Sequence, residues 1–243
     1  MRLKWRMETC WPLALVALLL AATPIQAEDA RETDIEIAWD SRYVTEGRDN
    51  LAGKGIAGAT VEAAFRFLTV GAWFGANPQS AVRYRELNGW LALEGAWGAF
   101  EGYVSYKHLR LLSDREHDNE MGVGLAYTAL PLGLALGVEG YYSFDAGGSF
   151  YELVLGGEYQ VLDWLMLAPS ATMGINAGYI EDGHDGANHI ALGLEATYPL
   201  AESVHAVGGI THSWKIDADP AHYPGDETLD DYWYGRLALG MTF

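Results

Sequence analysis

Among the side chains that could bind ions or act in catalysis, carboxylates outnumber the basic groups in this sequence. It contains 33 Asp and Glu residues against 15 Lys and Arg, which gives a formal net charge of -18 over 243 residues. Such a chain attracts cations, whereas a nucleic-acid-binding surface carries the opposite charge. We therefore expect no nucleic-acid partner. The single cysteine, Cys10, also excludes a disulfide framework and a cysteine-rich metal centre.

Two arrangements could contribute to hydrolysis, and neither completes a catalytic constellation. His212 and Ser213 are adjacent, but neighbouring residues of a strand point to opposite faces, so base and nucleophile could not meet. Asp230 and Asp231 share a loop with His222, a combination that an omptin-like aspartyl protease would use. Polar loops commonly carry such residues without a site. We therefore predict that the protein is not an enzyme.

The acidic loop segments are candidates for cation binding of a loose kind. Segments 181–186 and 217–231 hold clustered carboxylates, which hard divalent cations prefer. They lack the spacing of an EF-hand and show no zinc-binding tetrad. We expect no defined metal site and no cofactor, and instead loose bridging of Ca²⁺ or Mg²⁺ to lipopolysaccharide.

Alternation of apolar and polar residues indicates the elements that carry these side chains. In the last segment, Trp233, Leu237 and Phe243 share one face, whereas Tyr234 and Arg236 share the other. This is the period of a β-strand. The pattern predicts twelve strands in one domain, at residues 33–45, 56–65, 68–75, 86–96, 100–109, 119–128, 132–144, 150–160, 164–176, 188–198, 203–215 and 232–243.

The connections between these segments alternate in length. Every second one is short, such as 66–67 and 97–99, whereas most of the others are long and polar, such as 46–55 and 216–231. An even number of strands with short turns at one end and long loops at the other is typical of a transmembrane antiparallel β-barrel. A soluble β-sandwich is the alternative, because alternation by itself is a weak signal.

Aromatic residues on the apolar face favour the barrel over the sandwich. They recur at both ends of the strands, where the two headgroup layers of a bilayer would lie. The turn-end set is Phe65, Phe100, Tyr127, Tyr159, Tyr198 and Phe243, and the loop-end set is Tyr43, Phe74, Tyr142, Tyr151, Trp214 and Trp233.

The N-terminal segment has the order of a secretory signal peptide. Three basic residues within the first six positions precede an apolar run at 13–22, and a short break ends on the small residue Ala27. The run is too short to span a bilayer as a helix. We therefore predict a cleaved signal peptide at 1–27 and an outer-membrane barrel domain at 28–243.

The C-terminal residue Phe243 closes an alternating strand. A terminal aromatic residue in this position resembles the C-terminal signal of Gram-negative outer-membrane proteins. The resemblance implies that Phe243 is an assembly signal, that the barrel assembly machinery is a partner, and that the bacterial outer membrane is the location. Because backbone groups must be paired in lipid, the last strand should pair with the first.

The face opposite the apolar one is acidic and should line the inside of the barrel. Seven strands supply eight inward glutamates, namely Glu36, Glu62, Glu94, Glu101, Glu139, Glu152, Glu158 and Glu195. The inward basic residues are fewer: Arg42, Lys107, Lys215 and Arg236. Other inward positions are mostly small, for example Gly122, Gly124, Gly137 and Gly193. At twelve strands, this pattern predicts a narrow aqueous passage.

Residues 41–47 read Ser-Arg-Tyr-Val-Thr-Glu-Gly. They resemble the S-x-Y-V-x-x-G motif near the start of the TorF-type porin family, which comprises small proteobacterial outer-membrane proteins of unknown function. Ser41, Tyr43, Val44 and Gly47 match the motif, whereas Glu46 replaces the arginine that the family usually places before the glycine. The resemblance implies an outer-membrane porin and brings no substrate and no catalytic residue.

The sequence is compatible with three functions, in order of preference. The first is a small passive channel, embedded among outer-membrane lipid and lipopolysaccharide, whose carboxylates favour cations. The second is a structural or adhesive barrel without flux, in which the glutamates pair with basic and tyrosine side chains inside a closed interior. The third is an outer-membrane hydrolase, which the missing catalytic constellation disfavours.

Overall fold

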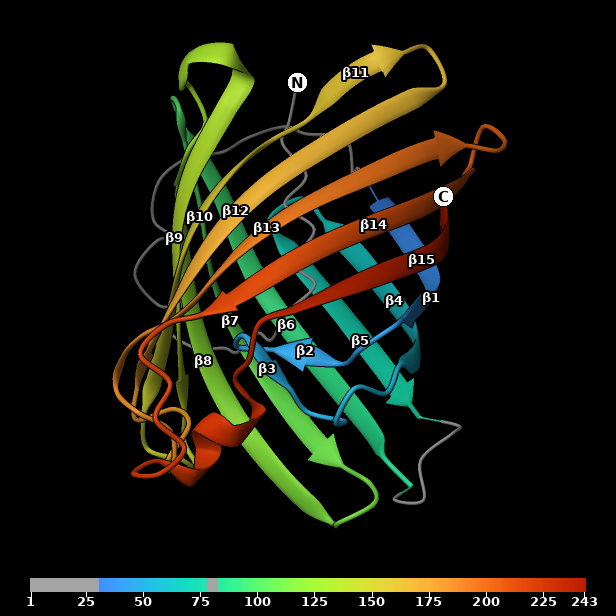
Figure 1. The fold of residues 1–243 in the computed structure, drawn as a ribbon. Helices are drawn as coiled ribbons and strands as arrows, with labels where there is room; N and C mark the ends of the chain where they lie inside the picture. The colour runs from blue at the N-terminus through green and yellow to red at the C-terminus, as the bar shows by residue number, and fades with distance from the viewer. Residues whose placement is uncertain (1–30, 78–82) are drawn as a thin grey trace, which may run out of the picture.

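The computed structural model describes residues 31–77 and 83–243 and shows a sheet that closes on itself (Figure 1). The predicted signal peptide at 1–27 lies outside the described residues. No helix among the described residues is long and apolar enough to cross a membrane. The barrel wall consists of β1 (Arg31–Asp40), β4 (Ile56–Phe65), β5 (Leu68–Ala76), β6 (Arg85–Trp97), β7 (Phe100–Leu111), β8 (Glu116–Tyr127), β9 (Leu134–Ser143), β10 (Ser149–Gly157), β11 (Tyr159–Leu162), β12 (Leu165–Ala177), β13 (Gly186–Pro199), β14 (Val204–Lys215) and β15 (Tyr232–Thr242).

All neighbouring wall strands are antiparallel. Strands β10 and β11 both pair with β12 and make one interrupted strand, so the wall has twelve strands. Strand β1 closes the barrel against β15, from Asp34 opposite Thr242 to Asp40 opposite Arg236. The predicted all-β antiparallel barrel of twelve strands is therefore confirmed.

The outside of the wall is apolar. Side chains such as Ile37, Val123, Leu192 and Leu237 are about half exposed or more, because they have no protein layer to pack against. Exposed aromatic residues lie at both ends of this band, as lipid headgroups require. They include Phe65, Phe100, Tyr127, Tyr198 and Phe243 at the turn end and Phe74, Tyr142, Tyr151, Trp214 and Trp233 at the loop end.

The first predicted strand is wrong beyond residue 40. The wall strand β1 ends at Asp40, and the chain then turns into the barrel as a short hairpin of β2 (Val44–Thr45) and β3 (Arg48–Asp49) (Figure 1). Glu46 and Gly47 form its turn with positive φ angles of 49° and 72°. The alternation through Tyr43 is real, but this side chain faces the lumen and not lipid.

The long loops gather at the lower end of the view in Figure 1, together with the short 3-10 helix η2 (Pro224–Thr228). A second 3-10 helix, η1 (Pro131–Gly133), lies in a turn at the other end. The apolar core is located inside the barrel towards the loop end, where Ile56, Phe150 and Leu229 are at most 2% exposed. This core supports the loops that cover the lumen.

Candidate functional site

The lumen holds a cavity of about 1040 Å³. Its lining includes Glu36, Glu62, Glu94, Glu101, Glu139, Glu195, Arg42, Lys107 and Arg236 from the predicted inward set. Glu152 lies on β10 and Glu158 lies between β10 and β11, but neither residue lines the cavity. Three carboxylates outside the predicted set, Glu32, Asp34 and Asp40, line it from β1.

The charge of the lining is unequal. Among the described residues that line the cavity, nine are acidic and four are basic. Three of the basic side chains already contact carboxylates: Arg42 pairs with Asp49 at 2.5 Å, Lys107 with Glu120 at 2.8 Å, and Arg236 with Glu36 at 2.5 Å and Asp40 at 3.1 Å. These pairs leave a clear excess of negative charge along the wall.

Asp40, Asp49 and Glu120 were not expected from the sequence as partners of these bases. Asp40 and Glu120 follow the inward period of their strands, so alternation could have indicated them. Asp49 belongs to the inner hairpin, residues 41–49, whose inward path the alternation did not reveal.

Glu86 is a further buried carboxylate that was not expected from the sequence. It is 1% exposed and accepts hydrogen bonds from the Tyr43 hydroxyl and the Asn88 amide, each at 2.7 Å. Because Tyr43 belongs to the inner hairpin and Glu86 to β6, this contact fastens the hairpin to the wall.

Inward glycines shape the wall of the cavity. On three neighbouring strands, Glu62 lies opposite Gly71, and Gly71 lies opposite Trp90. The indole extends across the glycine and donates its N–H to Glu62 at 3.2 Å. A Cβ atom on Gly71 would lie 2.2 Å from the indole ring. Trp90 can therefore lie against the wall only because position 71 is a glycine.

The same row of carboxylate, glycine and ring or base recurs around the barrel. In each case the register places the glycine between an inward glutamate and a larger residue. A ring lies over Gly240, Gly124 and Gly174, whereas at Gly209 the Glu195 side chain is nearest to the Cβ position, at 3.4 Å. The further rows are Glu36–Gly240–His205, Glu139–Gly124–Tyr103, Glu152–Gly174–His189 and Glu195–Gly209–Arg236.

Gly124 lines the cavity, as expected of a small inward residue, but a ring also occupies the space beside it. The Tyr103 ring lies 2.0 Å from the position that a Cβ atom of Gly124 would take. Small inward residues thus make room for rings on the wall rather than for solvent alone. No spacing along the chain reveals this, because the partners come from three different strands.

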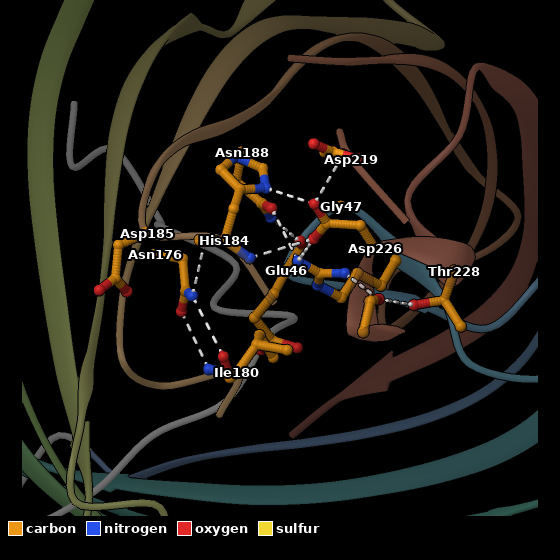
Figure 2. A network of polar contacts seen from close by, with 12 residues as sticks. Glu46, Gly47, Asn176, Ile180, His184, Asp185, Asn188, Asp219, Asp226 and Thr228 are labelled. Carbon is orange, nitrogen blue, oxygen red and sulfur yellow. Dashed lines mark hydrogen bonds and ion pairs between the residues drawn. The ribbon is translucent and has the colours of Figure 1, made fainter. Parts of the chain in front are cut away.

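The loop end of the lumen is covered by a roof, which comprises the inner hairpin and the loops 178–185 and 216–231. Arg48 of the hairpin is 2% exposed and contacts Asp226 at 3.0 Å and Asn188 at 3.2 Å. His184 approaches the other oxygen of Asp226 at 2.7 Å (Figure 2). This buried network ties the hairpin to both loops. The cavity lining includes hairpin residues 42–45 but no residue of the two loops.

Hydrogen bonding holds Asp226 in its charged form. Burial alone would raise the pKa of this carboxyl, but hydrogen bonds from the backbone of Asp219, from Arg48 and from His184 outweigh burial and lower the pKa to about 2. A carboxylate with several donors is stabilised relative to the acid. Asp226, Arg48 and His184 were not foreseen from the sequence, because their contacts span up to 178 residues along the chain.

The motif at residues 41–47 has a structural explanation in the roof. The Ser41 hydroxyl accepts the Gly235 N–H at 2.8 Å and anchors the start of the hairpin to β15. Gly47 lies against the His189 ring, where a Cβ atom would come within 2.3 Å, and its carbonyl accepts the Tyr232 hydroxyl at 2.5 Å. These contacts require the inward path of the hairpin.

The two hydrolytic arrangements are not assembled in the structure. Ser213 is 1% exposed, whereas the neighbouring His212 ring packs between Trp214 and Trp233 with centroid distances of 4.1 Å and 4.5 Å. Asp230 pairs with Lys215 at 2.7 Å, and His222 pairs with Asp219 at 2.7 Å. Each candidate group thus has a structural contact of its own.

Comparison with known proteins identifies the fold. The chain is similar to the KdgM porin, with 6% identity over 87% of this chain and 99% of that one, and a TM-score of 0.58. The NanC porin has 12% identity over 86% of this chain and 98% of that one, with a TM-score of 0.53. An outer-membrane channel from Pseudomonas putida F1 has 11% identity over 91% of this chain and 97% of that one, with a TM-score of 0.52.

Comparison by sequence gives a different result. No protein-family model and no curated protein matches the chain. The resemblance to the TorF-type porins therefore stays a prediction. At these low identities the structural likeness describes architecture, and the chain has the fold of a bacterial outer-membrane β-barrel.

Proposed function

We propose that the chain forms a passive channel of the bacterial outer membrane that prefers cations. This function agrees with the resemblance of residues 41–47 to the TorF-type porins. The observation that carries the proposal is the large lumenal cavity, with nine acidic and four basic side chains along its described lining. In a confined lumen these charges are poorly screened, so they attract cations and repel anions more strongly than they would in open water.

The roof favours a second candidate, a structural or adhesive barrel without flux. Its network buries Asp226 completely and Arg48 almost completely, and it covers the lumen at the end that would face the cell exterior. A channel must offer a path beside or through these loops. Measuring single-channel conductance of the refolded mature chain in planar bilayers distinguishes the two candidates, because only the channel carries current.

Selectivity is tested by replacing Glu94, Glu139 and Glu195 together with glutamine. Glutamine keeps the size and much of the hydrogen bonding of each side chain while removing three carboxylates from the cavity lining. We expect the variant to conduct and its preference for K⁺ over Cl⁻ to fall, because charged groups lining the lumen set selectivity. The measurement is the reversal potential under a KCl gradient.

A matched control replaces three glutamates that are exposed outside the cavity lining, namely Glu116, Glu181 and Glu202. This variant loses the same number of carboxylates and should retain the parent reversal potential. If both triple variants shift the potential equally, overall charge rather than the lumen controls selectivity. An unchanged potential in the lumenal variant would also refute the proposed role of these carboxylates.

A further inference from the structure

We propose that the lumen contains a binding subsite for organic ammonium ions on the wall formed by Tyr43, Trp73 and Trp90. The inference deepens the proposed function, on which it rests for the route that a solute takes into the cavity. All three side chains line the cavity, together with the carboxylate of Glu62. They come from the inner hairpin, β5 and β6, so the subsite exists only after the hairpin folds inward.

The rings are laid along the wall by neighbouring glycines. Trp73 lies over Gly58 and Gly75, where Cβ atoms would come within 2.6 Å and 2.1 Å of the indole. Tyr43 stacks on Trp73, with ring centroids 6.0 Å apart and planes inclined by 15°. Trp90 occupies the diagonal position on the next strand, because Trp73 lies opposite Asn88. The stacked pair Tyr43–Trp73 and the neighbouring Trp90 therefore line the same side of the cavity.

Carboxylates contact the polar edges of two of these rings. The Trp90 N–H donates to Glu62 at 3.2 Å, and the Tyr43 hydroxyl donates to Glu86 at 2.7 Å. Hydrogen bonds polarise their partners, so donation to an anion makes the ring more electron-rich. The negative ring faces attract cations, and tryptophan does so best among the aromatic residues. The hydrogen bonds at the ring edges and the negative ring faces therefore both favour a cation as the ligand.

The electrostatics of the whole lining also favour an ammonium ion over a neutral sugar. A carbohydrate could stack on the same rings, but it gains nothing from the excess of carboxylates. An organic cation gains both from the ring faces and from the negative potential of the cavity. The volume of about 1040 Å³ is at the upper end for small-molecule sites and accommodates such ions with their water.

The test uses choline as probe and 3,3-dimethylbutan-1-ol as its uncharged analogue of the same shape. Calorimetric titration of the refolded full mature barrel in detergent should show saturable binding of choline and much weaker binding of the alcohol. Replacing Trp90 with leucine should weaken choline binding about 5- to 30-fold, the range expected for a partly desolvated cation–π contact. Trp73→Leu and Glu62→Gln should act in the same direction.

The matched control is Trp97→Leu. Trp97 belongs to the same strand as Trp90, but its side chain is 58% exposed and does not belong to the cavity lining. This variant should bind choline like the parent. Heat-modifiable migration on gels identifies variants that still form barrels, and Glu62→Gln gives a lumenal variant that retains every ring.

Several results would overturn the subsite. They are equal binding of choline and the alcohol, unchanged affinity in both folded Trp90→Leu and Glu62→Gln, or saturable binding of glucose with the same tryptophan dependence. The last outcome would assign the surface to sugars. Conductance separates this inference from the channel itself. A parent that conducts without binding choline refutes only the subsite, whereas one that binds without conducting refutes only the channel.

Discussion

At the scale of single residues, inward glycines determine the surface of this lumen more than the acids do. Gly71 and Gly124 each leave space for a ring from a neighbouring strand, and at Gly71 that ring, Trp90, donates a hydrogen bond to Glu62 on the strand beyond. Glycine is the only residue that allows this close approach, because every other residue would place a Cβ atom there. The acids are consequently oriented by groups that a chain-local pattern cannot show.

Replacing Gly71 with alanine should therefore destabilise the barrel. The new methyl group would collide with the Trp90 ring at 2.2 Å and displace the indole from Glu62. We expect a loss of about 1–3 kcal/mol in the free energy of unfolding, as for overpacked sites, measured by denaturant unfolding in micelles.

Gly95→Ala is the control, because Gly95 lies on β6 with no atom within 4 Å of the position of its Cβ. It should change the same free energy by no more than about 0.5 kcal/mol. Equal effects of the two substitutions would show that loss of strand glycine as such, and not the ring contact, is responsible.

At the scale of elements, the inner hairpin is the segment on which the roof depends. Its Arg48 side chain links the hairpin to Asp226 and Asn188, and its backbone pairs with Leu229 in an isolated β-bridge. Removing one member of such a buried pair leaves an uncompensated charge, which is strongly destabilising. The roof should therefore open as a unit when Asp226 loses its charge.

Acid should open the roof between pH 4 and 2. The pKa of Asp226 falls from 3.8 to about 2 because burial is outweighed by its hydrogen-bond donors. A lowered pKa contributes stability that is present above 3.8 and is lost as the pH falls through about 2. Arg48 and His184, which face this carboxylate, would then lose the anionic partner that they share.

Hydrogen–deuterium exchange provides the measurement. Residues 216–231 should lose protection in this pH range, whereas the β13 and β14 strands should keep theirs. In Asp226→Asn, the same loss is expected already at neutral pH. Full protection of 216–231 in that variant at neutral pH would mean that the ion network does not hold the roof.

At the scale of the whole molecule, closure of the sheet decides stability in the membrane. Strand β15 completes the barrel against β1, and Phe243 adds the last rung, with Phe243 N to Thr33 O at 2.9 Å and Thr33 N to Phe243 O at 3.2 Å. Unpaired backbone groups are costly in lipid, so no edge strand can remain open there.

Deleting Phe243 should therefore impair assembly more than deleting Ala221 of the exposed loop. The first deletion removes two backbone hydrogen bonds from the seam and an aromatic side chain that is 65% exposed at the turn end. The second shortens a loop that tolerates changes in length. The readout is the yield of barrel in outer-membrane fractions with heat-modifiable migration. Equal yields would contradict the assigned role of Phe243.

The sequence by itself determined the wall of this protein. Period-two alternation, the lengths of the connections and the aromatic ends are local properties, and they sufficed for twelve strands and for the facing of residues such as Glu62 and Leu237. These properties are reliable because lipid outside and water inside act on every strand in the same way. They place a side chain on a face but not beside a partner.

Only the tertiary structure decided what occupies the lumen. The inner hairpin continues the alternation of β1, yet it leaves the wall to contact Tyr232, His189 and Asp226. These partners come from distant parts of the chain, so the local pattern does not reveal them. The contact of Trp90 with Glu62 likewise depends on the register of three strands, which closure of the whole barrel fixes. Alternation is a property of a single strand, so it does not indicate which residues of other strands a side chain contacts.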